Sequence, residues 1–377
     1  MGHDKLRRFA ENETFACLLQ PSAQELLADG YFHLRDHAVK GRWSAFFAGL
    51  PSGSSLSSAS RGGELPPETS GCAGPLPLPS EAGPSLLRSR GWLRFPEAVA
   101  AAGPQDKSTD GDLVLELGCG KGEYAIALAE RHPERNYIGV DIKGARLWKG
   151  AKYATEHRLP NVAFLRTRVE FITAFFAPGE VSEVWLTFSD PQYRSENSRL
   201  CSPLFLERYR SFLRPGGVVH LKTDSRFLHE YARAVCAVNG LRVLACTKDL
   251  YNMAGCEPAG SSSLETSFGP HRCASLAVPP LNVPRVAVFP GRTAGPASSQ
   301  PAIPSEVKEV QTFYERLFLE QGYPITYLSF VIDHDGPYVS PRDPEDFDTE
   351  AWRAAEGPRL LFGHDSAETR RQKLKNR

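Results

Sequence analysis

Between residues 112 and 251 the chain alternates between short apolar runs and longer segments in which apolar residues recur every three or four positions. The apolar runs have the length of buried strands and cover 113–117, 136–142, 162–166, 184–188, 218–223 and 242–246. Helical spacing follows from residue 124 and again over about 145–157, 203–213 and 226–238. This alternation predicts a mostly parallel sheet with helices on both faces, an α/β fold.

Two segments of different composition interrupt this pattern. Residues 51–110 and 256–303 are rich in Ser, Gly and Pro and hold too little apolar surface to form a core, so we expect disordered insertions. They divide the chain into an N-terminal arm over 1–50 and a main domain over 111–332. The arm is expected to be a peripheral helix and strap, or alternatively a basic arm that touches phosphate. Residues 333–377 are rich in charges and prolines and are expected to form a flexible tail.

Regular patterning returns after the second insertion. Apolar residues at helical spacing between 307 and 318 predict a helix, and 325–332 predicts the last strand. Thr312 and Glu315 are one helical turn apart, on one side of this helix. They are candidates to offer a hydroxyl and a carboxylate to the edge of a nucleobase, and the alternative is ordinary surface decoration.

Composition narrows the functional classes. The chain of 377 residues is 41% hydrophobic and 23% charged, as in soluble globular proteins, and its formal net charge is zero, so any surface for nucleic acid must be locally basic. The eight cysteines contain no C-x-x-C pair, which predicts reduced thiols in a cytoplasmic protein without a metal site. No apolar run approaches the ~20 residues of a membrane helix, and the first residues lack the apolar core of a signal peptide.

A glycine-rich turn follows the first predicted strand of the main domain. Gly118, Gly120 and Gly122 form a G-x-G-x-G pattern, and Glu116 stands two residues before it. Glycines let the backbone approach a ligand closely, and the acid suits the cationic groups of S-adenosylmethionine better than the pyrophosphate of a dinucleotide. The alternative is an ordinary strand–helix turn.

Acidic residues follow other predicted strands. Asp141 ends the second strand, 19 residues after Gly122, and is placed to accept the two hydroxyls of an adenosine ribose; the alternative is a helix N-cap. Asp190 follows the fourth strand within Ser189–Tyr193 (SDPQY), where ligands bind in open α/β sheets. The alternative for Asp190 is an Asx turn held by proline. Asp224 ends the fifth strand on the same rim.

Side chains around the SDPQY motif extend this candidate site. Pro191 fixes the backbone, and Tyr193 is placed to stack on a base. Arg194 and Arg199 are expected to supply local positive charge beside it. The fourth strand end is therefore the predicted meeting point of cofactor and substrate.

These motifs resemble one known family, the bacterial tRNA (guanine-N(7)-)-methyltransferases, and in particular the variant found in Bacteroidetes. The resemblance covers roughly 1–48, 111–254 and 304–332. The segments that carry it are KLRRFAE (5–11), KGRW (40–43), LELGCGKGEY (115–124), VDIKGARLW (140–148), NVAFLRT (161–167), GEVSEVWLTFSDPQ (179–192), HLKTDS (220–225), DLY (249–251) and TFYE (312–315).

The resemblance implies the class I, Rossmann-like fold of methyltransferases that use S-adenosylmethionine, with a seven-stranded mostly parallel sheet whose last strand is antiparallel. It implies methyl transfer to the N7 of guanine 46 in the tRNA variable loop, by a monomer or homodimer with tRNA as partner. Residue by residue it implies cofactor contacts from Glu116, Asp141, Arg168 and Asp190, and Asp190 as the catalytic residue. The implied substrate contacts come from Arg194, Asp224, Thr312 and Glu315.

The chain departs from the family pattern at three points. Gln192 replaces the usual tryptophan after the Asp-Pro pair, as in the Bacteroidetes variant, and the basic run after that motif is thin. Arg168 stands where members carry Asp or Asn. A guanidinium has only donors and cannot accept from the adenine amino group.

Two other functions stay open at this stage. The sequence from Asp190 to Tyr193 also resembles the D/N-P-P-Y/F loop of methyltransferases that act on exocyclic amines, although Gln192 replaces the second proline. The other possibility is a non-catalytic RNA-binding subunit. The intact Glu116, Gly118, Gly120 and Asp141 argue against it.

Overall fold

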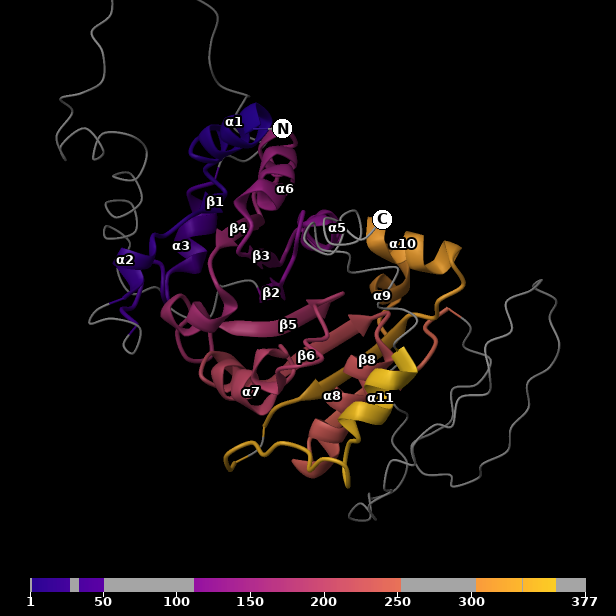
Figure 1. Cartoon of the computed structure of the whole chain (residues 1–377). Helices are drawn as coiled ribbons and strands as arrows, with labels where there is room; N and C mark the ends of the chain where they lie inside the picture. Colours follow the sequence, from indigo (N-terminus) through magenta and orange to yellow (C-terminus); the bar gives the residue numbers. More distant parts are fainter. Residues whose placement is uncertain (1, 28–33, 51–111, 252–302, 334, 357–377) are drawn as a thin grey trace, which may run out of the picture. The chain divides into compact units, whose positions relative to one another are not determined.

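The computed structural model describes residues 2–27, 34–50, 112–251, 303–333 and 335–356 (Figure 1). The insertion expected at 51–110 lies outside the described residues, and so does that expected at 256–303 except for its last residue. The chain forms two compact units. Unit 1 comprises Met1–Leu115 and Cys119–Glu180, and unit 2 comprises Glu116–Gly118 and Val181–Arg377. The domain boundaries proposed from sequence stay predictions.

The sheet of unit 1 has the strand order β1-β4-β3-β2. Three strands fall where the apolar runs predict them: β2 (Leu113–Leu117), β3 (Asn136–Asp141) and β4 (Val162–Arg166). β3 and β4 are parallel, and β1 (Leu18–Leu19) is a two-residue strand that pairs with β4 at the edge. Sequence patterning misses β1 because two residues carry no periodicity.

Helices of unit 1 cover this sheet. They are α5 (Glu123–Arg131), α6 (Gly144–Glu156), the N-terminal helices α1 (Gly2–Asn12), α2 (Ala23–Leu26) and α3 (Trp43–Ala48), and the 3-10 helix η3 (Val169–Ala174). α1 packs beside α6 (Figure 1). Asn12 donates to the Gly144 carbonyl at 3.0 Å, and the indole of Trp148 donates to Glu11 at 2.6 Å. The N-terminal arm is therefore a packed helix and strap.

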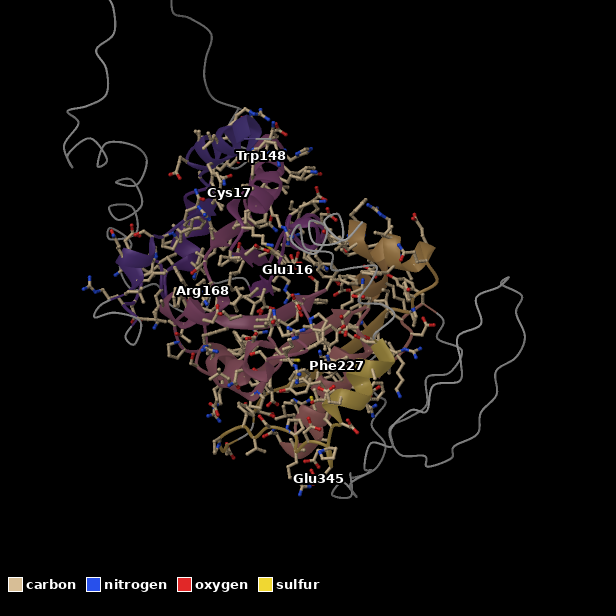
Figure 2. All side chains as sticks on the ribbon, in the orientation of Figure 1. Cys17, Glu116, Trp148, Arg168, Phe227 and Glu345 are labelled. Atoms are coloured by element: carbon tan, nitrogen blue, oxygen red, sulfur yellow. The ribbon has the colours of Figure 1, made fainter. Side chains whose placement is uncertain are left out.

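Buried aromatic and cysteine side chains fasten the arm further. Trp43 is 1% exposed and donates to the Phe175 carbonyl at 2.9 Å. Cys17 and Trp148, both labelled in Figure 2, belong to this part of unit 1, and the Cys17 thiol donates to the Ala151 carbonyl at 3.6 Å. Arg8 of α1 also contacts this tryptophan, with its guanidinium 4.8 Å from the Trp148 ring centroid.

The sheet of unit 2 has the strand order β5-β6-β8-β7. β5 (Val181–Thr187) and β6 (Leu213–Thr223) are parallel, whereas β8 (Thr326–Val331) is antiparallel to both β6 and β7 (Arg242–Thr247). The last strand is therefore antiparallel, as expected. Eight strands occur among the described residues where seven were expected, because β1 was not foreseen. Residues 214–217, which precede the strand expected at 218–223, form an irregular start of β6, with Gly216 at φ +75°.

The helices of unit 2 differ from the predictions at two places. α7 (Pro203–Arg210) and α8 (Arg226–Val238) were expected, but 307–318 is not one helix. It divides into α9 (Ser305–Glu309) and α10 (Phe313–Glu320), because Val310 is extended and Thr312 caps a new helix start. Apolar spacing continues across this break and so does not reveal it.

The second difference lies in the segment expected to be a flexible tail. Residues 349–356 form helix α11 (Thr349–Glu356), which packs against α8 (Figure 1). Phe347 and Trp352 are buried, and the Phe347 ring lies 5.2 Å from Phe227 and 5.5 Å from Tyr231 on α8. Two buried aromatic residues thus anchor this segment, although its charges and prolines predicted a flexible tail. Residues 357–377 lie outside the described part.

Candidate active site

The three positions after β2 require glycine for different structural reasons. All have left-handed φ angles, +79° at Gly118, +60° at Gly120 and +74° at Gly122. A Cβ on Gly122 would lie 2.3 Å from the Phe164 ring, so packing excludes a side chain there. A Cβ on Gly118 or Gly120 would meet no atom within 4 Å. These two positions need glycine for backbone conformation and leave an open backbone face, as a ligand cradle requires.

Asp141 of unit 1 is buried at the end of β3. Its Oδ2 accepts from the Gly120 amide at 3.0 Å, and its Oδ1 accepts from the Lys143 amide at 2.7 Å. The N-cap of α6 is Lys143, so Asp141 fixes the strand–helix turn without being the cap. Each carboxylate oxygen has two lone pairs. The arrangement therefore leaves acceptor capacity for the predicted ribose hydroxyls.

Glu116 of unit 2 is held at the end of a strand. It is 4% exposed, and its Oε1 accepts from the hydroxyl of Thr187, the last residue of β5, at 2.5 Å. A hydrogen bond this short is directional and orients both groups. The hydrogen bond to Thr187 thus orients the carboxylate predicted to meet the cofactor, and Figure 2 labels Glu116.

The loop that carries Asp190 has an unusual backbone. Phe188 and Gln192 have φ angles of +50° and +49°, a conformation that costs non-glycine residues about 1–3 kcal/mol each and clusters at functional sites. Oδ1 of Asp190 accepts from the Gln192 amide at 3.0 Å, and the Asp190 residue is exposed. The Asx turn considered from sequence is present, and it presents the carboxylate to solvent.

Asp224 lies at the same edge of unit 2. β5 and β6 are parallel neighbours, so their carboxyl ends, Thr187 and Thr223, share one edge of the sheet. Asp224 follows Thr223 and is half-buried, and the next residue, Ser225, caps α8 by accepting from the Leu228 amide at 3.1 Å. The structure therefore brings Glu116, Asp190 and Asp224 to one edge within unit 2.

Thr312 and Glu315 form a capping box at the start of α10. The Thr312 hydroxyl accepts from the Glu315 amide at 3.3 Å, and the Glu315 carboxylate accepts from the Thr312 amide at 3.4 Å. Glu315 is 0% exposed, whereas Thr312 is partly exposed. The two residues are thus neighbours, as predicted, but only Thr312 reaches the surface.

The Glu315 carboxylate is the centre of a buried polar cluster. Oε1 lies 2.7 Å from Nζ of Lys222 and accepts from the Tyr251 hydroxyl at 2.6 Å. Lys222, also 0% exposed, donates to the carbonyls of Val307 and Val310 at 2.6 and 2.9 Å. Burial raises the pKa of Glu315 and lowers that of Lys222, and the attraction between the two opposes both shifts. Direct binding of guanosine by Glu315 stays a prediction, and this geometry favours an indirect role.

Comparison with known proteins places the chain in a family. The family described as "Putative methyltransferase" matches residues 110–254. The tRNA (guanine-N(7)-)-methyltransferase of Christiangramia forsetii is 34% identical over 331 residues, which cover 87% of this chain and 98% of that protein. The protein of the same description from Porphyromonas gingivalis is 40% identical over 221 residues, or 59% of this chain and 71% of that protein. This chain belongs to the tRNA (guanine-N(7)-)-methyltransferase family.

Membership confirms the resemblance and the expected fold. The two relatives named above come from Bacteroidetes, and the family fold is the class I, Rossmann-like α/β fold with a mixed, mostly parallel sheet. Among solved structures, the 16S rRNA methyltransferase KamB is 15% identical to this chain, and the match covers 60% of this chain and 89% of KamB with a TM-score of 0.38.

Two further observations concern metal-binding side chains and membrane-spanning helices. Within the described ranges, no group of three or more His, Cys, Asp or Glu side chains is arranged to hold a metal ion. No helix in the part of the chain that the structure describes is long and apolar enough to cross a membrane.

The two arginines predicted beside Asp190 differ in burial. Arg199 is 3% exposed, and its guanidinium lies 4.7 Å from the Phe227 ring and 4.3 Å from the Tyr231 ring. Its Nε donates to the Gln192 carbonyl at 3.4 Å. Arg199 is therefore a buried cation that supports the loop carrying Asp190, and the local positive charge expected from it is not presented at the surface. Arg194 is exposed, as a substrate contact requires.

Arg168 of unit 1 stays a predicted cofactor contact. It precedes η3 at the N-cap position, its side chain is 53% exposed, and its Nη2 donates to Glu170 at 3.1 Å. The guanidinium also lies 5.7 Å from the Phe171 ring (Figure 2 labels Arg168). These contacts are local, so the side chain is oriented by its own helix.

Glu356 is a functional candidate that the motifs of this methyltransferase do not reveal. It ends α11 and is 2% exposed. Its carboxylate accepts from the Tyr193 hydroxyl at 2.5 Å, the Ser225 hydroxyl at 2.9 and 3.0 Å, and the Phe227 amide at 2.8 Å. Burial, followed by the Glu356 charge, raises the pKa of Tyr193. The Tyr193 hydroxyl is therefore held by Glu356, and stacking of its ring on a base stays a prediction.

Proposed function

We propose that this protein transfers a methyl group from S-adenosylmethionine to the N7 of guanine 46 in the tRNA variable loop. The observation that carries the proposal is the 34% identity with the Christiangramia forsetii tRNA (guanine-N(7)-)-methyltransferase over 98% of that protein. The exposed Asp190 on its strained loop gives the activity a candidate catalytic group. A cytoplasmic location, and a monomeric or homodimeric state, belong to the same proposal.

The residues present fit S-adenosylmethionine by their chemistry. Gly118 and Gly120 have open backbone faces that a Cβ would fill, and Glu116 and Asp141 are acceptors held in fixed orientations. The amino group and ribose hydroxyls of the cofactor are donors, so acceptors are what they need. When bound, the cofactor supplies an electrophilic methyl group on a sulfonium.

Methylation at N7 requires no proton transfer from the guanine before the methyl group is transferred. The N7 lone pair lies in the plane of the purine and is free without deprotonation, so the main task is to align nucleophile and methyl group, worth up to about 7–11 kcal/mol. The reaction places positive charge on the purine ring. The Asp190 carboxylate is suited to stabilise that charge as it develops. We assign it positioning and electrostatic roles.

Guanosine would be held by the exposed and half-exposed groups of unit 2. Asp224 is a carboxylate acceptor for the guanine amino edge, Thr312 offers a hydroxyl, and Arg194 offers charge to phosphate. Glu315 acts on Thr312 through the capping box and does not itself need to reach the base. Selection of guanine over adenine then rests on Asp224.

A second candidate is methylation of an exocyclic amine, favoured by the Asp190–Tyr193 loop. In such a loop an aromatic ring stacks on the base. Here the Tyr193 hydroxyl is bound to Glu356 and its ring lies 4.9 Å from Phe227. Product identification separates the two activities, because mild alkali and aniline cleave an RNA chain at 7-methylguanosine and do not cleave it at N-methylated amines.

The experiment compares the wild-type protein with Asp190→Ala, using unmodified tRNA, tritiated S-adenosylmethionine and nucleoside identification. We expect 7-methylguanosine from the wild type, and turnover reduced by at least about 100-fold in the variant with cofactor affinity retained in calorimetry. Glu345→Gln is the matched control, since Glu345 is an exposed acid of unit 2 well away from Glu116 (Figure 2). Undiminished turnover of Asp190→Ala would remove Asp190 from the mechanism.

A further inference from the structure

A cysteine, a histidine and a glutamate form a chain of contacts in unit 2 that the methyltransferase mechanism does not use. Cys246 lies on β7, and its Sγ is 3.7 Å from Nε2 of His229 on α8. Nδ1 of His229 is 3.5 Å from Oε1 of Glu230. His229 and Glu230 are 1% and 5% exposed, whereas Cys246 is exposed. The imidazole thus joins a buried carboxylate to a thiol at the surface.

The surrounding charges stabilise a thiolate–imidazolium pair. Burial lowers the pKa of His229. Its bonds to Cys246 and Glu230 raise the pKa by more than burial lowers it, so the net shift is upward. Burial raises the pKa of Cys246, and the charge of Glu230 raises it as well, but the hydrogen bond and charge of His229, with the charge of Arg233, outweigh both and the net shift is downward. Arg233 and Lys248 lie 2.7 and 3.4 Å from Glu230 and add positive charge to the cluster.

No further charge faces Cys246 from the neighbouring strand. Cys246 pairs with Leu328 of β8, whose neighbours in the ladder are Tyr327 and Ser329. The Tyr327 hydroxyl is bonded to His220, and burial raises the pKa of Tyr327, so this phenol stays neutral. Among the described residues, the charges that act on Cys246 therefore come from His229, Glu230 and Arg233 of α8.

The other described cysteines have the opposite environment. Cys17, Cys201 and Cys236 are buried, and burial raises their pKa values, to about 11 for Cys17, to about 12 for Cys201 and well above the ordinary value for Cys236. Cys119 is also buried. Because the thiolate is the nucleophilic form, exposure and charge both single out Cys246 among the cysteines the structure describes.

We propose that Cys246 is a modification site, a thiolate nucleophile activated by His229 that exchanges with low-molecular-weight disulfides. The thiolate attacks one sulfur of the disulfide, the disulfide bond breaks, and a mixed disulfide forms on Cys246. The other half leaves as a thiolate and carries the electron pair of the broken bond. Excess thiol reverses the exchange. The proposal is independent of the methyltransferase activity.

The test uses the full chain with Cys72, Cys256 and Cys273 replaced by serine, because these three cysteines lie outside the described residues. The protein is incubated with glutathione disulfide at pH 7, and peptides are analysed by mass spectrometry. We expect modification at Cys246 and none at Cys17, Cys201 or Cys236. Added Cys246→Ser should abolish the signal.

A role for His229 is tested by rate and by spectroscopy. In His229→Gln the reaction at pH 7 should slow by about tenfold, the effect of raising a thiol pKa by one unit. In the protein with His229 intact, the thiolate absorbance near 240 nm should titrate below the ~8.5 of a free cysteine. This second measurement stands even if the variant fails to fold. A rate no faster than in urea-unfolded protein, or a titration at or above 8.5, would overturn the proposal.

Discussion

Replacement of Lys222 by methionine isolates the energetics of the buried pair beneath Thr312. The change keeps most of the length of the side chain and removes its charge, which leaves the Glu315 carboxylate buried without its cation. Loss of one partner of a buried pair typically costs about 3–5 kcal/mol. The carbonyls of Val307 and Val310 also lose a donor, which adds about 1–3 kcal/mol if they stay buried.

The pH dependence of this loss follows from the alternative open to Glu315. A buried carboxylate without a cation takes up a proton, at a cost set by the difference between the pH and its ordinary pKa of 4.5. That cost is about 3 kcal/mol at pH 7 and under about 1 kcal/mol at pH 5. The folded variant then binds more protons than the unfolded chain, so its stability falls as the pH rises from 5 to 7.

The assay is hydrogen exchange of the β6 and β8 amides, because these strands report unit 2 alone and the whole chain need not unfold in one step. We expect Lys222→Met to lower their opening free energy by about 2–3 kcal/mol more at pH 7 than at pH 5. Lys222→Met with Glu315→Gln should lose this difference. Equal losses at the two pH values in the single variant would refute the reasoning.

Two further predictions concern Glu356 and Glu230. Glu356→Gln keeps the shape of the side chain but weakens its bonds to Tyr193 and Ser225, so kcat/KM for tRNA should fall about tenfold, or about 1.4 kcal/mol, with unchanged cofactor affinity in calorimetry; parallel loss of cofactor affinity would contradict a local role. Burial opposes ionisation of Glu230, but His229, Arg233 and Lys248 lower its pKa to about 2. The ionised Glu230 carboxylate therefore stabilises the folded state by about 3 kcal/mol above pH 4.5, and this contribution is lost as the pH falls toward 2. The acid unfolding transition, followed by circular dichroism, should be less steep in Glu230→Gln. An identical acid limb would exclude this contribution.

Local chemistry along the chain determined much of the fold and the location of the site. The apolar runs matched β2 to β8 to within about three residues except at the start of β6, because burial on both faces of a strand requires uninterrupted apolar residues. Gly118, Gly120 and Gly122 were identified because left-handed backbone favours glycine. Asp190 and Asp224 were placed at one rim because parallel strands bring their carboxyl ends to one edge of a sheet.

Only the tertiary structure decided which polar residues are surface groups and which are internal supports. Glu315, Arg199 and Glu356 look like exposed charges in sequence, yet each is buried against partners between 28 and 163 residues away. Burial of a charge is stable only when a partner compensates the lost hydration, and the partner is set by how distant segments pack. Periodicity reports only the neighbours along one helix or strand, so it contains no information about that choice.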